Sequence, residues 1–177
     1  RVEGINITHM DTKTLGGGLA IMLEQECEMV SQNISIPQII KSLNKLRYED
    51  SIALYTIGTL KYLRKGGRIG KVEGTIGNIL RIKPVITVND EGVYVTVSKG
   101  FGIQRSFLAM KDLLVEKFKN AAIDLIVHFG DDLEKAKQLG ESLRKELNIR
   151  NISLYKLTPV LGIHTGPVMF AYVARKV

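Results

Sequence analysis

The chain has 177 residues, of which 45% are hydrophobic and 24% are charged, a composition typical of a folded globular protein. Its single cysteine excludes an internal disulfide, and no apolar run reaches the roughly 20 residues that a membrane-spanning helix requires. The first residues also lack the apolar core of a signal peptide. We therefore expect a cytoplasmic protein that makes no stable membrane insertion.

The excess of positive charge is concentrated in one stretch. The formal net charge is +7. Between positions 61 and 83 a single acidic residue, Glu73, stands among seven cations, which are Lys61, Arg64, Lys65, Arg68, Lys71, Arg81 and Lys83. Such a local cluster favours an acidic partner surface or a phosphate over a uniformly basic nucleic-acid binder.

The first elements read as a strand, a glycine loop and a helix. Apolar residues alternate over residues 5–9, and three glycines at 16–18 then precede a helical pattern formed by Leu19, Leu23, Cys27 and Val30. We interpret this stripe, Cys27 included, as a core-facing surface. The glycines allow either close approach of an anion or tight packing of the helix on a strand, and the packing interpretation is favoured.

A second helix is predicted from Ser35, which combines with Gln38 in a capping box and is followed by a first-turn proline. Its periodicity breaks around residues 47–50. We place a domain junction there, so that residues 1–48 form the remnant of an N-terminal α/β domain and residues 49–177 form a C-terminal α/β domain.

The basic stretch begins after a predicted strand at 51–57. A short amphipathic helix carries Leu60 and Leu63 and ends at Gly66 and Gly67, which can leave helical geometry at little cost. Arg68 follows, and it is interpreted equally well as a cap of this helix or as a contact with a partner. Residues 72–80 are predicted to be helical.

The remaining pattern alternates strands and helices. Residues 82–88 and 93–97 predict a hairpin, residues 107–118 a helix, residues 123–129 a buried strand, and residues 133–147 a helix. Strands are then expected at 152–157 and after Pro167. Between them, His164 and Thr165 precede a Gly-Pro pair on what we expect to be a loop, where His164 is either a structural residue or a donor to a carboxylate.

Catalytic and metal-binding patterns are missing from the sequence. It contains no phosphate-binding loop, no dinucleotide fingerprint and no nucleophile elbow. The three histidines, His9, His128 and His164, lie far apart without a second ligand at metal spacing. An enzyme acting alone is not indicated, and we expect no cofactor.

Three segments together resemble the DegV family of bacterial fatty-acid-binding proteins, which includes the acyl-carrying subunits of fatty acid kinase. These are residues 63–69 (LRKGGRI), Gly77 with residues 82–84 (IKP), and residues 164–167 (HTGP). Residues 11–13 (DTK) also resemble that family's segment before its glycines. The family chain is longer at its N-terminus, so this sequence resembles its C-terminal part.

The resemblance implies a C-terminal domain with a mainly antiparallel sheet covered by helices, preceded by the last strand and helices of a parallel-sheet domain. It implies a long-chain fatty acid, such as palmitate, in a tunnel between the domains, and an ATP-dependent kinase subunit that phosphorylates its carboxylate. His164, Thr165 and Gly166 would lie near that carboxylate, while Arg68 and Lys99 would contact the kinase. The alternative is a phosphate- or nucleic-acid-binding module that uses residues 61–83.

Overall fold

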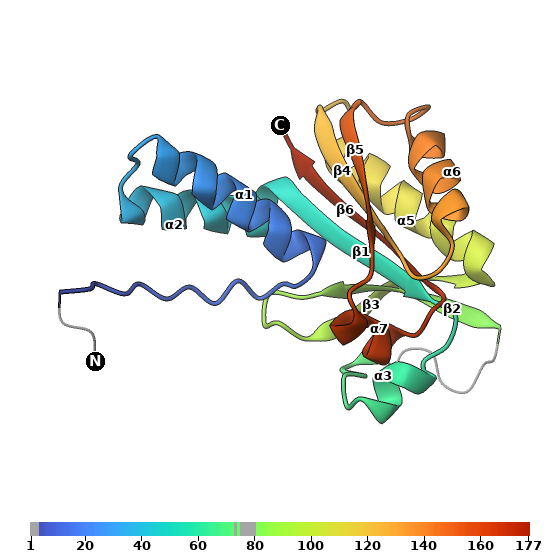
Figure 1. Cartoon of the computed structure of the whole chain (residues 1–177). Coiled ribbons are helices and arrows are strands. Elements are labelled where there is room, and N and C mark those ends of the chain that lie inside the picture. Colours follow the sequence, from blue (N-terminus) through green and yellow to red (C-terminus); the bar gives the residue numbers. More distant parts are fainter. Residues whose placement is uncertain (1–3, 73, 75–80) are drawn as a thin grey trace.

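The computed structural model describes residues 4–72, 74 and 81–177. A six-stranded sheet with the order β3-β2-β1-β6-β4-β5 runs through it (Figure 1). Its strands are β1 (Ser51–Ile57), β2 (Ile82–Val88), β3 (Tyr94–Phe101), β4 (Ile123–Phe129), β5 (Ile149–Lys156) and β6 (Met169–Lys176). Every neighbouring pair is antiparallel except β4 and β5. The prediction of a mainly antiparallel sheet covered by helices is therefore confirmed.

One face of the sheet carries the larger core. Alternate strand residues such as Leu54, Leu125 and Tyr172 point to this face, where each is almost fully buried. Two helices cover it, α5 (Ile103–Phe118) and α6 (Leu133–Leu143). The apolar stripe predicted for residues 107–118 is the face of α5 that enters this core.

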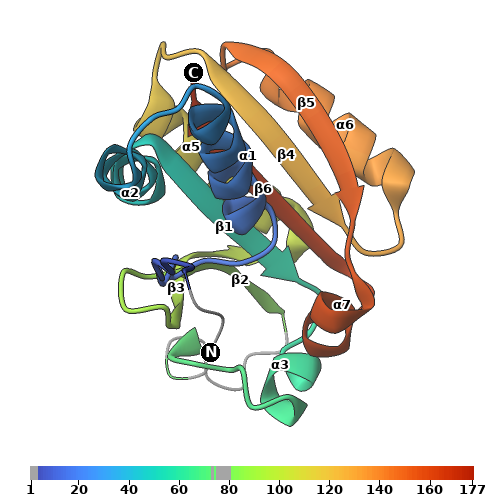
Figure 2. The same ribbon diagram turned by 60° about the vertical axis from the view of Figure 1, so that its left-hand side comes forward.

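The opposite face is covered by two separate groups of helices (Figure 2). One group is α1 (Gly17–Ser31), α2 (Ile36–Lys45) and a π-helical turn, η1 (Leu46–Asp50). The other is α3 (Lys61–Lys65) and α7 (Pro159–Thr165). Because each group buries its own apolar cluster, the sheet between them is left with a less completely filled region.

Local sequence signals correctly predict where several helices and strands begin or end. The capping box of Ser35 and Gln38 is present at the start of α2. Asn89 holds the hairpin turn, since its Oδ1 accepts hydrogen bonds from the backbone N–H of Glu91 (3.2 Å) and of Val93 (2.8 Å).

Arg47 ties the N-terminal segment to this hairpin. Its guanidinium donates hydrogen bonds to the carbonyl oxygens of Thr12, Lys13, Val88 and Asn89, at 2.9–3.2 Å. The segment that leads into α1 is thereby fixed against the end of β2, which determines where α1 starts on the sheet.

Two expectations for the N-terminal part are wrong. Residues 5–9 form no strand, and Ile7 is 86% exposed, because an alternating segment needs a neighbouring strand and none of the described residues supplies one. Cys27 is exposed rather than buried. α1 turns Ile21 and Met22 to the sheet, which leaves the stripe that contains Cys27 facing away.

The helix predicted for residues 72–80 falls largely on residues 73 and 75–80, outside the described part of the chain. Among the described helices, none has the length and apolar character needed to cross a membrane.

Candidate functional site

A small pocket lies on the sheet between the start of α1 and α7. Its floor is a row of paired residues across the strands, with Tyr55 on β1, Ala171 on β6 and His128 on β4 in register. The short side chain of Ala171 stands between two rings, which leaves the hollow. Gly16 and Leu161 close it from above. The volume is about 50 Å³, enough for a few water-sized groups.

The lining is mainly apolar and carries no charged side chain. Thr14, Tyr55 and His128 are its only residues with polar side chains. Burial raises the pKa of Tyr55 above its ordinary value of 10.0, so this phenol stays protonated at neutral pH. The pocket therefore suits an apolar group with, at most, a neutral polar substituent.

His128 is the functional candidate that the sequence analysis missed. Both of its ring nitrogens are inaccessible to solvent, and a backbone hydrogen bond with Tyr155 acts on the ring. Burial lowers its pKa below the ordinary 6.5. A polar residue within the apolar run 123–129 is the signal that could have drawn attention to it, because a buried polar side chain is more informative than a buried apolar one.

The glycine loop before α1 serves packing. A Cβ on Gly17 would lie 2.7 Å from His128 Nε2 and 3.0 Å from Val173 Cγ2, so only glycine allows α1 to approach the sheet this closely. The packing interpretation of the glycines is thus the one that the structure shows.

His164 and Thr165 lie in the last turn of α7, and the prediction that they lie on a loop is wrong. Pro159 at the first turn starts a short helix, and Gly166 ends it with a φ of 78°. The Thr165 hydroxyl donates to the carbonyl of Leu161 at 3.1 Å. His164 packs against Gly66, with its Nδ1 buried and unpartnered among the described residues.

The glycine pair after α3 and the HTGP segment, distant in sequence, are neighbours in the structure. Gly66 lies against the His164 ring, and Gly166 lies against the Tyr62 ring, where a Cβ would be 2.5 Å from two ring carbons. α3 and α7 thus meet through two glycines. The structure therefore brings His164 next to Gly66, whose carbonyl oxygen accepts a hydrogen bond from Arg68.

Arg68 caps α3, as one of its two interpretations predicted. Its backbone N–H donates to the Leu63 carbonyl (2.9 Å), and its Nη1 donates to the Gly66 carbonyl (2.7 Å). The side chain is exposed, and its positive charge opposes the rise that burial causes in the pKa of Tyr94. The cap does not prevent a contact with a partner.

Most of the basic stretch is on the surface, with Lys83 as the exception. Lys83 turns inward and donates to the Gly58 carbonyl at 2.6 Å. Lys99 is exposed on β3, five residues beyond Tyr94. Tyr94 itself lies near Arg68, because its carbonyl oxygen accepts a hydrogen bond from the backbone N–H of Lys71. At about 3.3 Å per residue, Lys99 lies roughly 16 Å farther along the strand. It does not join the group around Arg68.

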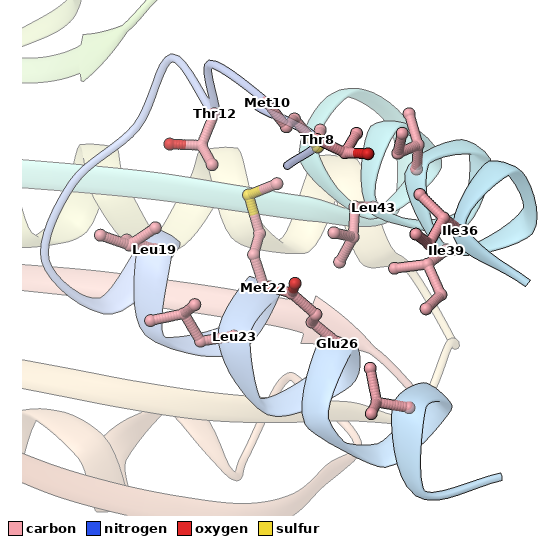
Figure 3. A pocket seen from close by; sticks show the side chains of 12 residues that line it. Thr8, Met10, Thr12, Leu19, Met22, Leu23, Glu26, Ile36, Ile39 and Leu43 are labelled. Atoms are coloured by element: carbon pink, nitrogen blue, oxygen red, sulfur yellow. The ribbon is translucent and has the colours of Figure 1, made fainter. Parts of the chain in front are cut away.

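A wider apolar groove lies between α1, α2 and the N-terminal segment (Figure 3). Its volume is about 470 Å³, and Leu19 and Leu23 of α1 face Ile36 and Ile39 of α2 across it. Three residues of the stripe predicted to face the core, Leu19, Leu23 and Val30, line this groove instead. No group of acidic, histidine or cysteine side chains in the described residues is arranged to hold a metal ion.

Comparison with known proteins gives consistent matches. The sequence model of the DegV family, described as a family of uncharacterised proteins, matches residues 1–177. A DegV domain-containing protein of Clostridium acetobutylicum is 34% identical over 177 residues, which cover 98% of this chain and 62% of the relative. One from Staphylococcus aureus is 32% identical over 173 residues, with 97% and 61% covered.

Solved structures agree with this match. A fatty-acid-binding DegV family protein from Thermus thermophilus superimposes with a TM-score of 0.87 at 24% identity, covering 96% of this chain and 61% of that one. A stearic-acid-binding protein from Eubacterium ventriosum has a TM-score of 0.76 at 25% identity, with 94% and 58% covered. This chain thus spans about three-fifths of these relatives. The match over its whole length, together with the shared fold, shows that the chain belongs to the DegV family.

Proposed function

We propose that this protein binds a long-chain fatty acid, such as palmitate, and that the pocket between α1 and α7 receives part of the acyl chain. The observation that carries this proposal is the uncharged, mainly apolar pocket over Ala171. The related structure from Eubacterium ventriosum, which binds stearic acid, supports it.

The energetics favour an acyl ligand. Each methylene removed from water contributes about 0.8 kcal/mol, so even a few buried methylenes bind appreciably. The pocket is smaller than the roughly 300–1,000 Å³ of ordinary ligand sites, so only a short length of acyl chain fits without movement of its walls. The rest of the ligand would occupy the expected tunnel between the domain of residues 49–177 and an N-terminal domain to which residues 1–48 belong.

His164, Thr165 and Gly166 are the proposed contacts of the carboxylate. The support is their position at the end of α7, since Leu161 of this helix lines the pocket and His164 follows one turn later. The buried, unpartnered Nδ1 of His164 has hydrogen-bonding capacity to spare, and a charge-assisted hydrogen bond contributes about 1.5–3 kcal/mol.

The protein would present its ligand to an ATP-dependent fatty acid kinase subunit and would need no cofactor of its own. The proposed docking site is the basic surface, defined by the exposed residues Lys61, Arg64, Lys65, Arg68, Lys71 and Arg81. Arg68 is its proposed central contact, and Lys99 is proposed as a second contact farther along the molecule.

The test begins with mass spectrometry of lipid extracted from the purified protein, where a long-chain fatty acid is expected. Acyl phosphate formation is then measured with a purified kinase subunit and ATP. We expect Arg68→Ala to bind the fatty acid normally but to be phosphorylated at least about tenfold more slowly, a loss of about 1.4 kcal/mol. The charge-matched control is Lys137→Ala on α6, an exposed lysine on the other side of the sheet.

Equal phosphorylation rates in the two variants would remove Arg68 from the docking site. An extract without lipid, combined with tight and salt-sensitive binding of nucleic acid, would instead favour the alternative in which residues 61–83 form a phosphate- or nucleic-acid-binding module.

A further inference from the structure

A partition of three residues separates the apolar pocket over Ala171 from a polar pocket beside it. Thr14, Leu15 and Val88 line both pockets and therefore lie between them. The polar pocket has a volume of about 270 Å³, and three of its lining side chains are charged, namely Asp11, Lys13 and Glu91. An acyl chain in the apolar pocket depends on this partition to keep water and charge away from it.

Half of the partition lies on a segment without regular secondary structure. Thr14 and Leu15 precede α1, and residues 11–15 belong to no helix or strand. Lys13 has a φ of 50°, a left-handed conformation that a residue with a side chain keeps only where its surroundings enforce it. Its N–H donates to Asp11 Oδ1 at 3.1 Å, but a bond within the segment does not fix the segment to the sheet. That requires an anchor elsewhere.

Arg47 supplies this anchor. Its Nε and Nη2 donate to the carbonyl oxygens of Thr12 (3.2 Å) and Lys13 (2.9 Å), the two residues that precede the partition segment. Nη2 also donates to the carbonyl oxygens of Val88 and Asn89, each at 3.1 Å. One planar guanidinium therefore fixes the distance between the two sides of the partition.

The direction of the Arg47 side chain is fixed in turn by its neighbours. Arg47 lies in η1, a π-helical turn, and such turns are rare and occur frequently at functional sites. Leu46 of the same turn is buried in the cluster under α1 and α2. The Tyr48 ring lies beside the guanidinium, whose carbon is 5.1 Å from the ring centroid. The anchor is thus held at its base and along its side.

We propose that Arg47 is a positioning residue for acyl binding, which holds the partition in place and so keeps the pocket over Ala171 apolar and closely fitted. The proposal rests on the fatty-acid binding proposed above and adds a residue on which the affinity depends. Arg47 lines neither pocket, so it acts through the segments that it holds. A wall that moves back by about 0.5–1 Å loses a quarter to a half of its dispersion attraction for an apolar ligand.

The experiment measures the dissociation constant of palmitate, by displacement of a fluorescent fatty acid, for the wild type and two variants. Arg47→Met removes all four hydrogen bonds and is expected to weaken binding at least about tenfold. Arg47→Lys keeps the charge but donates from a single atom, so it holds the two sides less well and is expected to weaken binding about two- to fivefold.

Arg175 provides the matched control. It also ties α1 to the sheet, since it donates to the Ile21 carbonyl at 3.4 Å and pairs with Glu24 of α1 and Asp124 of β4. Arg175 lines neither pocket. Arg175→Met is therefore expected to lower the melting temperature while it binds palmitate as the wild type does. Melting curves establish that each variant is folded in the binding assay.

Hydrogen exchange adds a readout that a general loss of stability does not move. The backbone N–H groups of Gly18 and Ala20 donate to the carbonyl oxygens of Leu15 (3.1 Å) and Gly16 (3.0 Å), at the end of the partition segment. In Arg47→Met these two amides are expected to exchange at least about tenfold faster, because their acceptors lose their anchor. The amides of β4 are expected to keep their wild-type rates.

The outcomes separate the two proposals. Palmitate bound by Arg47→Met as tightly as by the wild type would overturn the role of Arg47 and leave fatty-acid binding standing. Equal weakening in Arg47→Met and Arg175→Met would also overturn it, because the loss would then follow from a loosened α1. If Arg47→Met does not fold, Arg47→Lys carries the same comparisons. A wild-type protein that binds no palmitate would overturn fatty-acid binding itself and, with it, the inference.

Discussion

At the scale of single residues, the contribution of His128 to the free energy of unfolding depends on pH. The folded protein holds this ring neutral because burial lowers its pKa, whereas in the unfolded chain the ring takes up a proton near its ordinary pKa of 6.5. Between these two pKa values the unfolded state binds more protons. The contribution of His128 therefore makes the free energy of unfolding fall as the pH drops through 6.5 and level off below the lowered pKa.

We predict that His128→Leu flattens this dependence. Thermal unfolding measured from pH 7.5 to pH 5 should show a smaller loss of stability in the variant than in the wild type, because a leucine has no proton to gain. His9→Gln, a change at an exposed histidine of the N-terminal segment, is the matched control and should keep the wild-type slope. A His128→Leu curve parallel to that of the wild type would contradict the assignment.

At the scale of elements, the contact between α3 and α7 depends on glycine. Gly66 has an ordinary helical φ of −82°, so alanine is acceptable to the backbone there, but its Cβ would overlap His164 Nδ1. We predict that Gly66→Ala lowers the free energy of unfolding by about 1–3 kcal/mol, as overpacking does. Urea denaturation measures this change.

Gly162 in α7 provides the control, because a Cβ there meets nothing within 4 Å. Gly162→Ala should be neutral or stabilising by up to about 1 kcal/mol, the gain in helix propensity. Adding His164→Ala to Gly66→Ala should recover part of the loss, since it removes the overlapping ring. Strictly additive effects of the two substitutions would show that the helices meet in another way.

How far the sequence predicts these elements depends on whether the signal is local. Strands β1 and β4 and the start of α2 follow from alternation, apolar runs and the capping box of Ser35, all of which act within a few residues. The stripe through Cys27 fails because periodicity identifies an apolar side of a helix without telling which neighbour it meets. α1 has apolar side chains toward both the sheet and the groove.

The candidate site likewise depends on contacts between distant residues, which local sequence signals do not predict. Gly66 and His164 were each identified from a short motif. Their contact is a tertiary contact, which the spacing of residues in the sequence does not predict. His128 was missed because its importance comes from its burial beside the pocket, which only the packed structure shows. The π-helical turn and the hydrogen bonds of Arg47 likewise depend on where the hairpin lies.

At the scale of the whole molecule, the larger core and the pocket lie on opposite faces of the sheet. Its α5 and α6 face buries the larger cluster, while the other face carries two smaller clusters with the pocket between them. The basic surface adjoins the α7 side of this pocket through the contact of Gly66 with His164. A ligand in the pocket and a partner on the basic surface would therefore share α3 and α7.

The central claim is that the pocket over Ala171 receives the acyl chain. The most direct measurement is the dissociation constant of palmitate for Ala171→Leu, which fills the pocket, against Ala109→Leu, which adds the same side chain on α5 across the sheet. The account predicts binding weakened at least about tenfold, or about 1.4 kcal/mol, in Ala171→Leu alone. Equal, wild-type affinity in both folded variants would contradict it.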